Sequence, residues 1–306
     1  MERHAGRPFI IAVDAGGTHT RVACFGLDGC LIATASGAGG SPFHNADAAN
    51  AVADTVTACL RSGDLDATDA ASLAAGMAEI RPGRGGDDET NAWAATYFSA
   101  LPASCPRVIV NDAVAAHRGA LLGRAGIIVV AGTGSMILAI TDDGREVDSG
   151  RFEHYAGAAR HLVNDAMQLI LLGADRPADA ELVAAVLAYW DAADVDALRT
   201  VVLGLERRDR REVMQRYGRL APAITAAADT SPLADRVLRD LARKTARGVH
   251  VLSPLVSETQ TPVALAGALA THPAFRNRLA DALRDEPGAV QATIAAPSLD
   301  PLRGAA

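Results

Sequence analysis

Short apolar runs alternate with amphipathic segments and polar turns through the first half of the chain. Runs bounded by turn residues predict buried strands, and apolar residues spaced three or four positions apart predict amphipathic helices. Val52, Val56 and Leu60 show this helical spacing. The expected strands of this half are residues 9–13, 22–25, 30–35, 73–77, 107–110, 126–131 and 136–140. The expected helices are residues 46–61, a segment containing Trp93 and Tyr97, and residues 113–122.

The second half changes character and becomes rich in alanine and arginine between residues 157 and 257. Proline and glycine residues divide this stretch into at least four expected helices, among them 158–172 and 233–252. The remaining expected elements are two strands at 262–266 and 290–294 and a helix at 274–283.

Two strand–turn–strand units share one plan. Residues 9–25 and 126–140 each contain two apolar runs that flank a turn with two glycines. The units lie about 115 residues apart, and self-similarity at a fixed spacing indicates a repeated architecture. The sequence therefore predicts a duplicated domain plan.

Composition narrows the classes of function. The chain has 306 residues, 49% of them hydrophobic, with a net charge of −7 and a pI of about 5.6. This chain length allows two domains, and the negative charge argues against a nucleic acid or an anionic membrane as the main partner. No apolar stretch approaches the length of a membrane span, and the first residues lack a signal-peptide pattern. We therefore expect a cytoplasmic protein.

The numbers and positions of lysine and cysteine residues exclude further kinds of phosphate-binding and metal-binding site. Lys244 is the only lysine, so neither a Walker P-loop nor the protein-kinase strand lysine is available. Any phosphate contacts must come from backbone amides, hydroxyl groups and Mg²⁺ instead. The cysteines show no CxxC spacing, which indicates free thiols in a reducing compartment rather than disulfides or a metal site. They are Cys24, Cys30, Cys59 and Cys105.

The first turn, Asp14-Ala-Gly-Gly-Thr18, is the strongest candidate for phosphate binding near the N-terminus. Its glycines leave backbone N–H groups open to an anion without side-chain crowding. Asp14 stands at the end of a strand, where a carboxylate can hold a hydrated Mg²⁺. An ordinary glycine-rich hairpin is the alternative interpretation of this stretch.

A second turn, a later glycine and an aspartate are further candidates for site residues. The second turn is Gly132-Thr-Gly-Ser135, and Gly267 follows a later apolar strand. Asp112 follows the strand at 107–110 and precedes a helix, so it is a candidate general base. A helix N-cap is the alternative role for Asp112, and both roles are compatible at one helix N-terminus.

The order of these motifs resembles the sugar kinase, hexokinase and actin superfamily, and more narrowly its N-acetylglucosamine kinase branch, which is described as BadF/BadG/BcrA/BcrD-type ATPases. The resemblance implies an α/β fold of two actin-like, ribonuclease H-like lobes around a nucleotide cleft. The lobes would be residues 1–123 and 124–306, with a helical insertion at 157–257. The resemblance also implies a homodimer that uses ATP and Mg²⁺ on a small sugar.

The same resemblance assigns roles to individual residues. It places Asp112 as the general base and as a substrate ligand. It places Asp14 at the metal and Gly267 beside the adenosine. The residues that it places at the ATP phosphates are Gly16, Gly17, Thr18, Gly132, Thr133 and Gly134.

The segment 148–157 departs from the family pattern, because Gly-Gly-Trp-Gly and Gly-Asp-Glu-Gly-Ser are both missing there. The family aspartate that binds sugar hydroxyls falls near Glu153 or His154, and the usual asparagine of the sugar loop is replaced near Ser41. Ser41, Glu153 and His154 are therefore the candidate substrate ligands. Surface or packing roles are the alternative for His44 and His154.

Three functions follow from the sequence as hypotheses. The leading one is an ATP-dependent kinase for a hydroxyl of a sugar or amino sugar, with a substrate altered from N-acetylglucosamine. The second is an ATPase that activates a reductase or dehydratase, which the cysteine positions do not favour. The third is a non-catalytic sensor that binds a nucleotide or sugar, which the altered segment 148–157 favours and the retained aspartates oppose.

Overall fold

The computed structural model describes residues 6–81, 92–99, 101–205, 210–257, 259–285 and 290–306. The chain divides into two compact units. Unit 1 consists of Met1–Ile128, Leu138–Asp148 and Ala295–Ala306, and unit 2 consists of Val129–Ile137 and Ser149–Ile294. Unit 1 thus combines the N-terminal residues with the C-terminal segment Ala295–Ala306.

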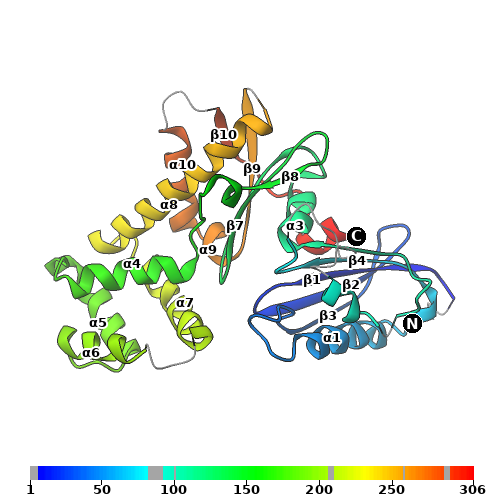
Figure 1. The fold of residues 1–306 in the computed structure, drawn as a ribbon, viewed down its shortest axis with the longest axis horizontal. Coiled ribbons are helices and arrows are strands. Elements are labelled where there is room, and N and C mark those ends of the chain that lie inside the picture. The colour runs from blue at the N-terminus through cyan, green and yellow to red at the C-terminus, as the bar shows by residue number, and fades with distance from the viewer. Residues whose placement is uncertain (1–5, 82–91, 100, 206–209, 258, 286–289) are drawn as a thin grey trace. The chain divides into compact units, whose positions relative to one another are not determined.

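Unit 1 is built on a five-stranded sheet with the order β3-β2-β1-β4-β5 (Figure 1). The first three strands are antiparallel neighbours, and β4 and β5 run parallel to β1. The strands are β1 Phe9–Ala15, β2 His19–Gly26, β3 Leu31–Ala38, β4 Ala70–Met77 and β5 Arg107–Asn111. The helices of this unit are α1 Ala48–Ser62, α2 Ala92–Thr96, α3 Asp112–Leu121 and α11 Pro301–Ala305.

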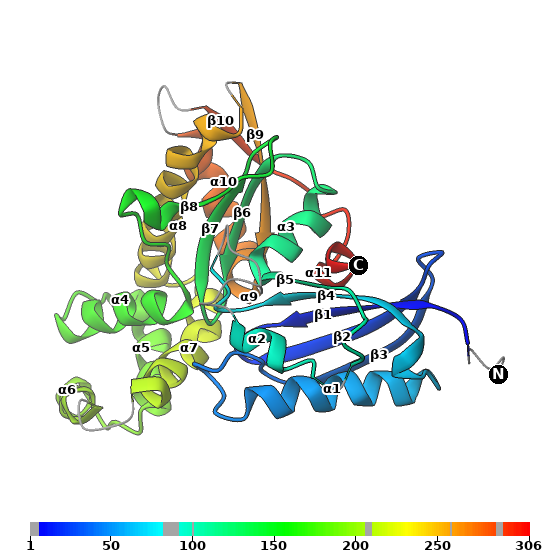
Figure 2. The ribbon, with the colours of Figure 1, turned by 45° about the vertical axis from the view of Figure 1, so that its right-hand side comes forward.

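The sheet of unit 1 buries both faces, because its apolar residues alternate along β1. Phe9, Ile11 and Val13 belong to a core that also contains side chains of α1. Ala12 faces the other way and packs in a smaller cluster with Leu302 of α11. Figure 2 shows α1 covering one face of this sheet and α3 with α11 on the opposite face.

A glycine in β4 lets α3 approach the sheet closely. A Cβ atom on Gly76 would lie 2.7 Å from the Cβ atom of Ala115 and 3.3 Å from the Cα atom of Asp112. Gly76 is also the β4 partner of Asp14 in β1. The close packing at Gly76 therefore fixes the start of α3 near the end of β1.

A second five-stranded sheet has the order β10-β9-β6-β7-β8. Its strands are β6 Gly126–Ala131, β7 Ser135–Ile140, β8 Glu146–Asp148, β9 Gln260–Ala266 and β10 Gln291–Ile294. In unit 2, α8 packs against α10, and α7 packs against α4 and α5. The helices of unit 2 are α4 Ala159–Leu171, α5 Ala180–Tyr189, α6 Val195–Gly204, α7 Arg210–Ala226, α8 Pro232–Leu252, α9 Ala268–Thr271 and α10 Pro273–Arg284.

Most elements expected from the sequence are confirmed within a few residues at their ends. The helix expected around Trp93 ends at Thr96, so Tyr97 lies just outside it. Strand β8 and helix α11 were not expected from the apolar pattern. Within the described ranges, no helix combines the length and apolar character needed to cross a bilayer.

His117 of α3 is a fully buried titratable side chain. Burial lowers the pKa of its imidazole to about 4, although the backbone of Gly126 opposes the shift. The unfolded chain, with a pKa near 6.5, binds more protons between these two values, so stability falls as the pH falls through this window. The full shift corresponds to on the order of 3 kcal/mol in the free energy of unfolding.

We therefore expect His117→Leu to flatten the acid dependence of stability. Denaturant unfolding of wild type and variant at pH 7 and pH 4.5 measures this difference directly. A wild-type loss that exceeds the variant's loss by about 2 kcal/mol agrees with the burial argument. Equal losses in the two proteins would contradict it.

Candidate functional site

The turn between β1 and β2 closes on itself through its first glycine. The Gly16 N–H donates to the His19 carbonyl at 3.0 Å, and the Gly16 carbonyl accepts from the Gly40 N–H at 3.0 Å. The N–H groups of Gly17 and Thr18 donate to no acceptor within the described residues. These two N–H groups, and not the Gly16 N–H, are therefore available to an anion.

Glycines hold the backbone of this turn against a neighbouring loop. A Cβ atom on Gly39 would lie 2.2 Å from the Gly17 carbonyl oxygen, and one on Gly40 would lie 2.8 Å from the Ala15 Cβ atom. A Cβ atom on Gly16, in contrast, would meet only the His19 carbonyl, at 3.5 Å. The turn is thus supported from one side and leaves space at Gly16.

The turn between β6 and β7 in unit 2 repeats this arrangement. The Gly132 N–H donates to the Gly134 carbonyl at 2.9 Å, and the Gly132 carbonyl accepts from the Ala159 N–H at 3.0 Å. The N–H groups of Thr133 and Gly134 donate to no acceptor in the part of the chain that the structure describes. Each turn therefore uses its first glycine for closure and leaves the next two N–H groups free, as a phosphate cradle requires.

Gly267 lies against this second turn. It has a φ of +89°, and a Cβ atom there would lie 2.5 Å from the Ala131 carbonyl oxygen and 3.2 Å from the Gly132 nitrogen. Only glycine accepts both the backbone angle and the close approach. The structure therefore brings together the second and third glycine motifs predicted from the sequence.

Asp14 is mostly buried in β1, with 19% of its side chain exposed. Burial raises the pKa of its carboxyl group, the charge of Arg21 lowers it, and the charge of Asp300 raises it. The Arg21 Nη1 atom lies 3.8 Å from an Asp14 carboxylate oxygen. No cluster of three or more His, Cys, Asp or Glu side chains suited to a metal occurs among the described residues. A hydrated Mg²⁺ that also binds phosphate oxygens needs only one or two carboxylates, so Asp14 fits as its ligand.

Asp112 is the first residue of α3, and Asn111 is the N-cap of this helix. The Asn111 side-chain oxygen accepts a hydrogen bond from the Ala113 N–H at 2.8 Å. The sequence suggested Asp112 as the N-cap, and that alternative is wrong by one residue. The Asp112 carboxylate also accepts from the Ala113 N–H, at 2.9 Å. The Asn111 amide donates to the Ile80 carbonyl. Asn111 therefore fixes the start of α3, and the second carboxylate oxygen of Asp112 accepts no hydrogen bond from the described residues.

The pKa of Asp112 is raised to about 7. Burial is the largest cause, the charges of Asp14 and Glu79 add to it, and the hydrogen bond from Ala113 opposes it. A carboxylate with a pKa near neutrality is a better proton acceptor than an ordinary aspartate. Strongly perturbed carboxyl groups of this kind cluster at functional sites.

Ser41 is fully buried and belongs to a polar cluster that the sequence did not predict. Its hydroxyl oxygen lies 3.0 Å from His44 Nδ1 and donates to a Glu79 carboxylate oxygen at 3.5 Å. The His44 ring lies over Gly17, where an added Cβ atom would be 3.2 Å from Nδ1. Ser41, His44 and Glu79 are named here the Ser41 cluster. The position of Glu79 just after β4 is the only sequence signal that points to it.

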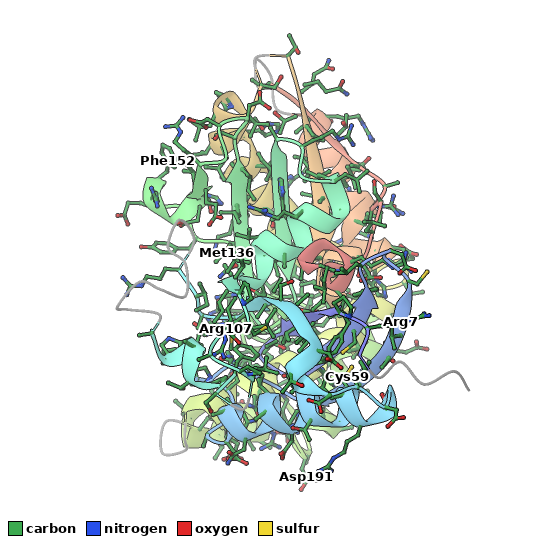
Figure 3. The ribbon with its side chains drawn as sticks, turned by 90° about the vertical axis from the view of Figure 1, so that its right-hand side faces the viewer. Arg7, Cys59, Arg107, Met136, Phe152 and Asp191 are labelled. Carbon is green, nitrogen blue, oxygen red and sulfur yellow. The ribbon has the colours of Figure 1, made fainter. Side chains whose placement is uncertain are left out.

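The two candidate ligands in unit 2 differ in exposure. Glu153 is exposed, has a φ of +54°, and accepts a hydrogen bond from the Tyr155 hydroxyl at 3.1 Å. His154 packs against α8, where a Cβ atom on Gly248 would lie 2.6 Å from its ring. This packing favours the structural interpretation of His154. Figure 3 labels the nearby Phe152, whose side chain is about half exposed.

The two α/β units, each with a glycine turn, have the actin-like α/β fold that the solved structures described below also carry. The model of the BadF/BadG/BcrA/BcrD ATPase family matches residues 11–306, and the chain belongs to this family. A search of curated proteins finds no match to the chain.

Solved structures carry the same fold. A proposed N-acetylglucosamine kinase from Chromobacterium violaceum has 26% identity and a TM-score of 0.74, with 98% of each chain covered. A proposed N-acetylglucosamine kinase from Porphyromonas gingivalis has 17% identity and a TM-score of 0.70, with 96% of each chain covered. A ROK-family glucokinase from Streptomyces griseus, bound to glucose and AMPPNP, has 20% identity and a TM-score of 0.65, with 97% of this chain and 98% of that chain covered. The predicted two-part actin-like fold is thereby confirmed.

Proposed function

We propose that this protein is an ATP-dependent kinase that phosphorylates a hydroxyl group of a sugar or amino sugar. The observation that carries the proposal is Asp112, a half-buried carboxylate with a pKa near 7 at the start of α3. The family is one of ATPases, and the solved structures described above are named as sugar kinases. A general base in the same unit as a phosphate-binding turn is what a kinase needs and what a simple nucleotide sensor does not.

The two glycine turns suit the phosphates of ATP. Gly17 and Thr18 in unit 1, and Thr133 and Gly134 in unit 2, present N–H groups without protein acceptors in the described ranges. We assign these four N–H groups to phosphate oxygens, and Gly267 to the adenosine. Bound at Asp14, Mg²⁺ would supply positive charge that offsets the negative charge developing on the phosphate oxygens.

Asp112 accepts the proton of the sugar hydroxyl while the hydroxyl oxygen bonds to the γ-phosphorus of ATP. The bond from the γ-phosphorus to the bridging oxygen of ADP breaks, and the electron pair leaves with ADP. Because the carboxylate must be unprotonated to accept the proton, the rate should rise as the pH increases through about 7.

The acceptor is proposed to differ from N-acetylglucosamine. The family carboxylate for two sugar hydroxyls has no clear replacement, because Glu153 is exposed and bonded to Tyr155 while His154 packs on α8. Each lost charged hydrogen bond weakens binding by about ten- to a hundredfold. We also propose a homodimer, as the family resemblance suggests, and a cytoplasmic location, as the sequence pattern indicates.

Initial rates of ADP release test this proposal with ATP and Mg²⁺, with and without a panel of sugars. The panel contains glucose, glucosamine, N-acetylglucosamine and N-acetylmannosamine. ADP release that depends on one sugar, with N-acetylglucosamine a poor substrate, agrees with the proposal. Sugar-independent ADP release points to an ATPase, and ATP binding without turnover points to a sensor.

A further inference from the structure

We propose that Glu79 is a second substrate-binding carboxylate of unit 1, held in position by Ser41 and His44. It would accept a hydrogen bond from a hydroxyl or ammonium group of the sugar other than the hydroxyl that reacts. This inference rests on the proposed kinase function and deepens it, because it names a side chain that binds the sugar substrate.

The Ser41 cluster holds one edge of the Glu79 carboxylate. The Ser41 hydroxyl donates to Glu79 Oε1 at 3.5 Å, and His44 Nδ1 lies 3.9 Å from the same oxygen. Ser41 is fully buried, and 20% of the His44 side chain is exposed. Ser41 is thus the hydrogen-bond donor to Oε1, and His44 Nδ1, 3.0 Å from the Ser41 oxygen, holds that hydroxyl in place.

The other edge of the carboxylate remains open. Glu79 Oε2 accepts from no donor within the described ranges, and 36% of the Glu79 side chain is exposed. An ionised carboxylate offers about four acceptor sites on its two oxygens. A bound sugar can use the unfilled ones without breaking the contacts to Ser41 and His44.

The backbone at Glu79 is held in a conformation that side chains rarely adopt. Its φ is +74°, in the left-handed region that favours glycine. The next residue, Ile80, is buried and accepts the Asn111 amide through its carbonyl. Strained non-glycine residues that the surrounding structure holds in place occur preferentially at functional sites. The same contact ties Glu79 to the helix start that carries Asp112.

Electrostatics indicates the class of substrate. Three carboxylates act on one another in this part of unit 1, because the charges of Asp14 and Glu79 both raise the pKa of Asp112. Arg21 and Asp300 act on Asp14, and His44 is the titratable neighbour of Glu79. This surplus of negative charge favours a sugar with donor groups, neutral or carrying an ammonium, over an acidic sugar.

Two variants of Glu79 test the inference on the full-length protein. Glu79→Gln keeps the size of the side chain and removes its charge, and Glu79→Gly suits the positive φ, so neither change should unfold the chain. Glu181→Gln, an exposed glutamate in the first turn of α5, is the matched control. The assay measures KM for the best sugar, KM for ATP, and the pH profile of kcat/KM.

Both Glu79 variants are expected to raise KM for the sugar about tenfold, the low end for a charged hydrogen bond at a partly exposed site. KM for ATP should stay unchanged, and the acid limb of the profile should move to lower pH because a negative neighbour of Asp112 is gone. Unchanged sugar KM in an active enzyme, or an equal rise in both KM values, would overturn the inference alone. A wild type that phosphorylates no sugar would overturn the proposed function, and this inference with it.

Discussion

Replacing Asp112 by asparagine is expected to lower the rate of phosphoryl transfer by about 10²- to 10⁴-fold, the usual contribution of a general base. Asparagine keeps the shape of the side chain and its place at the start of α3, but it cannot accept the hydroxyl proton at neutral pH. The N–H groups assigned to the ATP phosphates belong to other residues. Nucleotide affinity should therefore stay close to that of the wild type.

Measuring the stability of both proteins shows whether the asparagine variant is still folded when its rate is compared with that of the wild type. The folded pKa of Asp112, about 7, lies above its ordinary value of 3.8, so the folded state binds more protons between these values. The ionised Asp112 therefore lowers stability progressively as the pH rises from about 4 to 7. At pH 8 the asparagine variant should unfold at the same or a higher denaturant concentration than the wild type. Single-turnover rates then report chemistry, and near wild-type turnover in this variant would remove Asp112 from the role of base.

Valine at Gly16 or Gly132 is expected to weaken ATP binding by about a hundredfold. A branched side chain at either turn would keep phosphate oxygens from two N–H donors, and each charge-assisted hydrogen bond contributes about 1.5 kcal/mol or more. Their loss together corresponds to about 3 kcal/mol, or about two decades in affinity. The turns themselves should tolerate the change. An added Cβ atom meets its nearest neighbour at 3.5 Å at Gly16 and at 3.7 Å at Gly132, both ordinary contacts.

Gly218→Ala in α7 is the matched control for the turn variants, because a Cβ atom there meets nothing within 4 Å. Alanine in a helix interior should raise stability slightly and leave ATP affinity alone. Calorimetric titration with ATP and Mg²⁺ measures the affinities, and thermal unfolding checks the fold of each variant. Folded Gly16 and Gly132 variants that bind ATP as the wild type does would show that phosphates bind elsewhere.

The parts of the fold predicted from the sequence are those with local signals. The strands from β1 to β7 are short apolar runs between turn residues, and the two glycine turns stand between such runs. Strand β8 has three residues, Glu146–Asp148, too few to show an alternation. Helix α11 carries an N-cap signal in Asp300 followed by Pro301, but at five residues it is too short for an apolar period.

The parts of the site that the sequence did not predict arise from tertiary packing. The Ser41 cluster joins the loop after β3 to the turn after β4, and the His44 ring lies over the β1–β2 turn. No short motif relates positions separated in this way. The sequence also does not show which N–H groups of each glycine turn are available to a ligand. In the structure, the N–H group of the first glycine closes the turn, and the next two have no acceptor among the described residues.

Transfer of the γ-phosphate to a sugar tests the central claim most directly. The protein is incubated with γ-³²P-labelled ATP, Mg²⁺ and the sugar that stimulates ADP release, and the products are separated and counted. The account predicts label on the sugar with wild type, in an amount equal to the ADP formed, and almost none with Asp112→Asn. Label recovered only as inorganic phosphate, or equal labelling of the sugar by the two proteins, would contradict it.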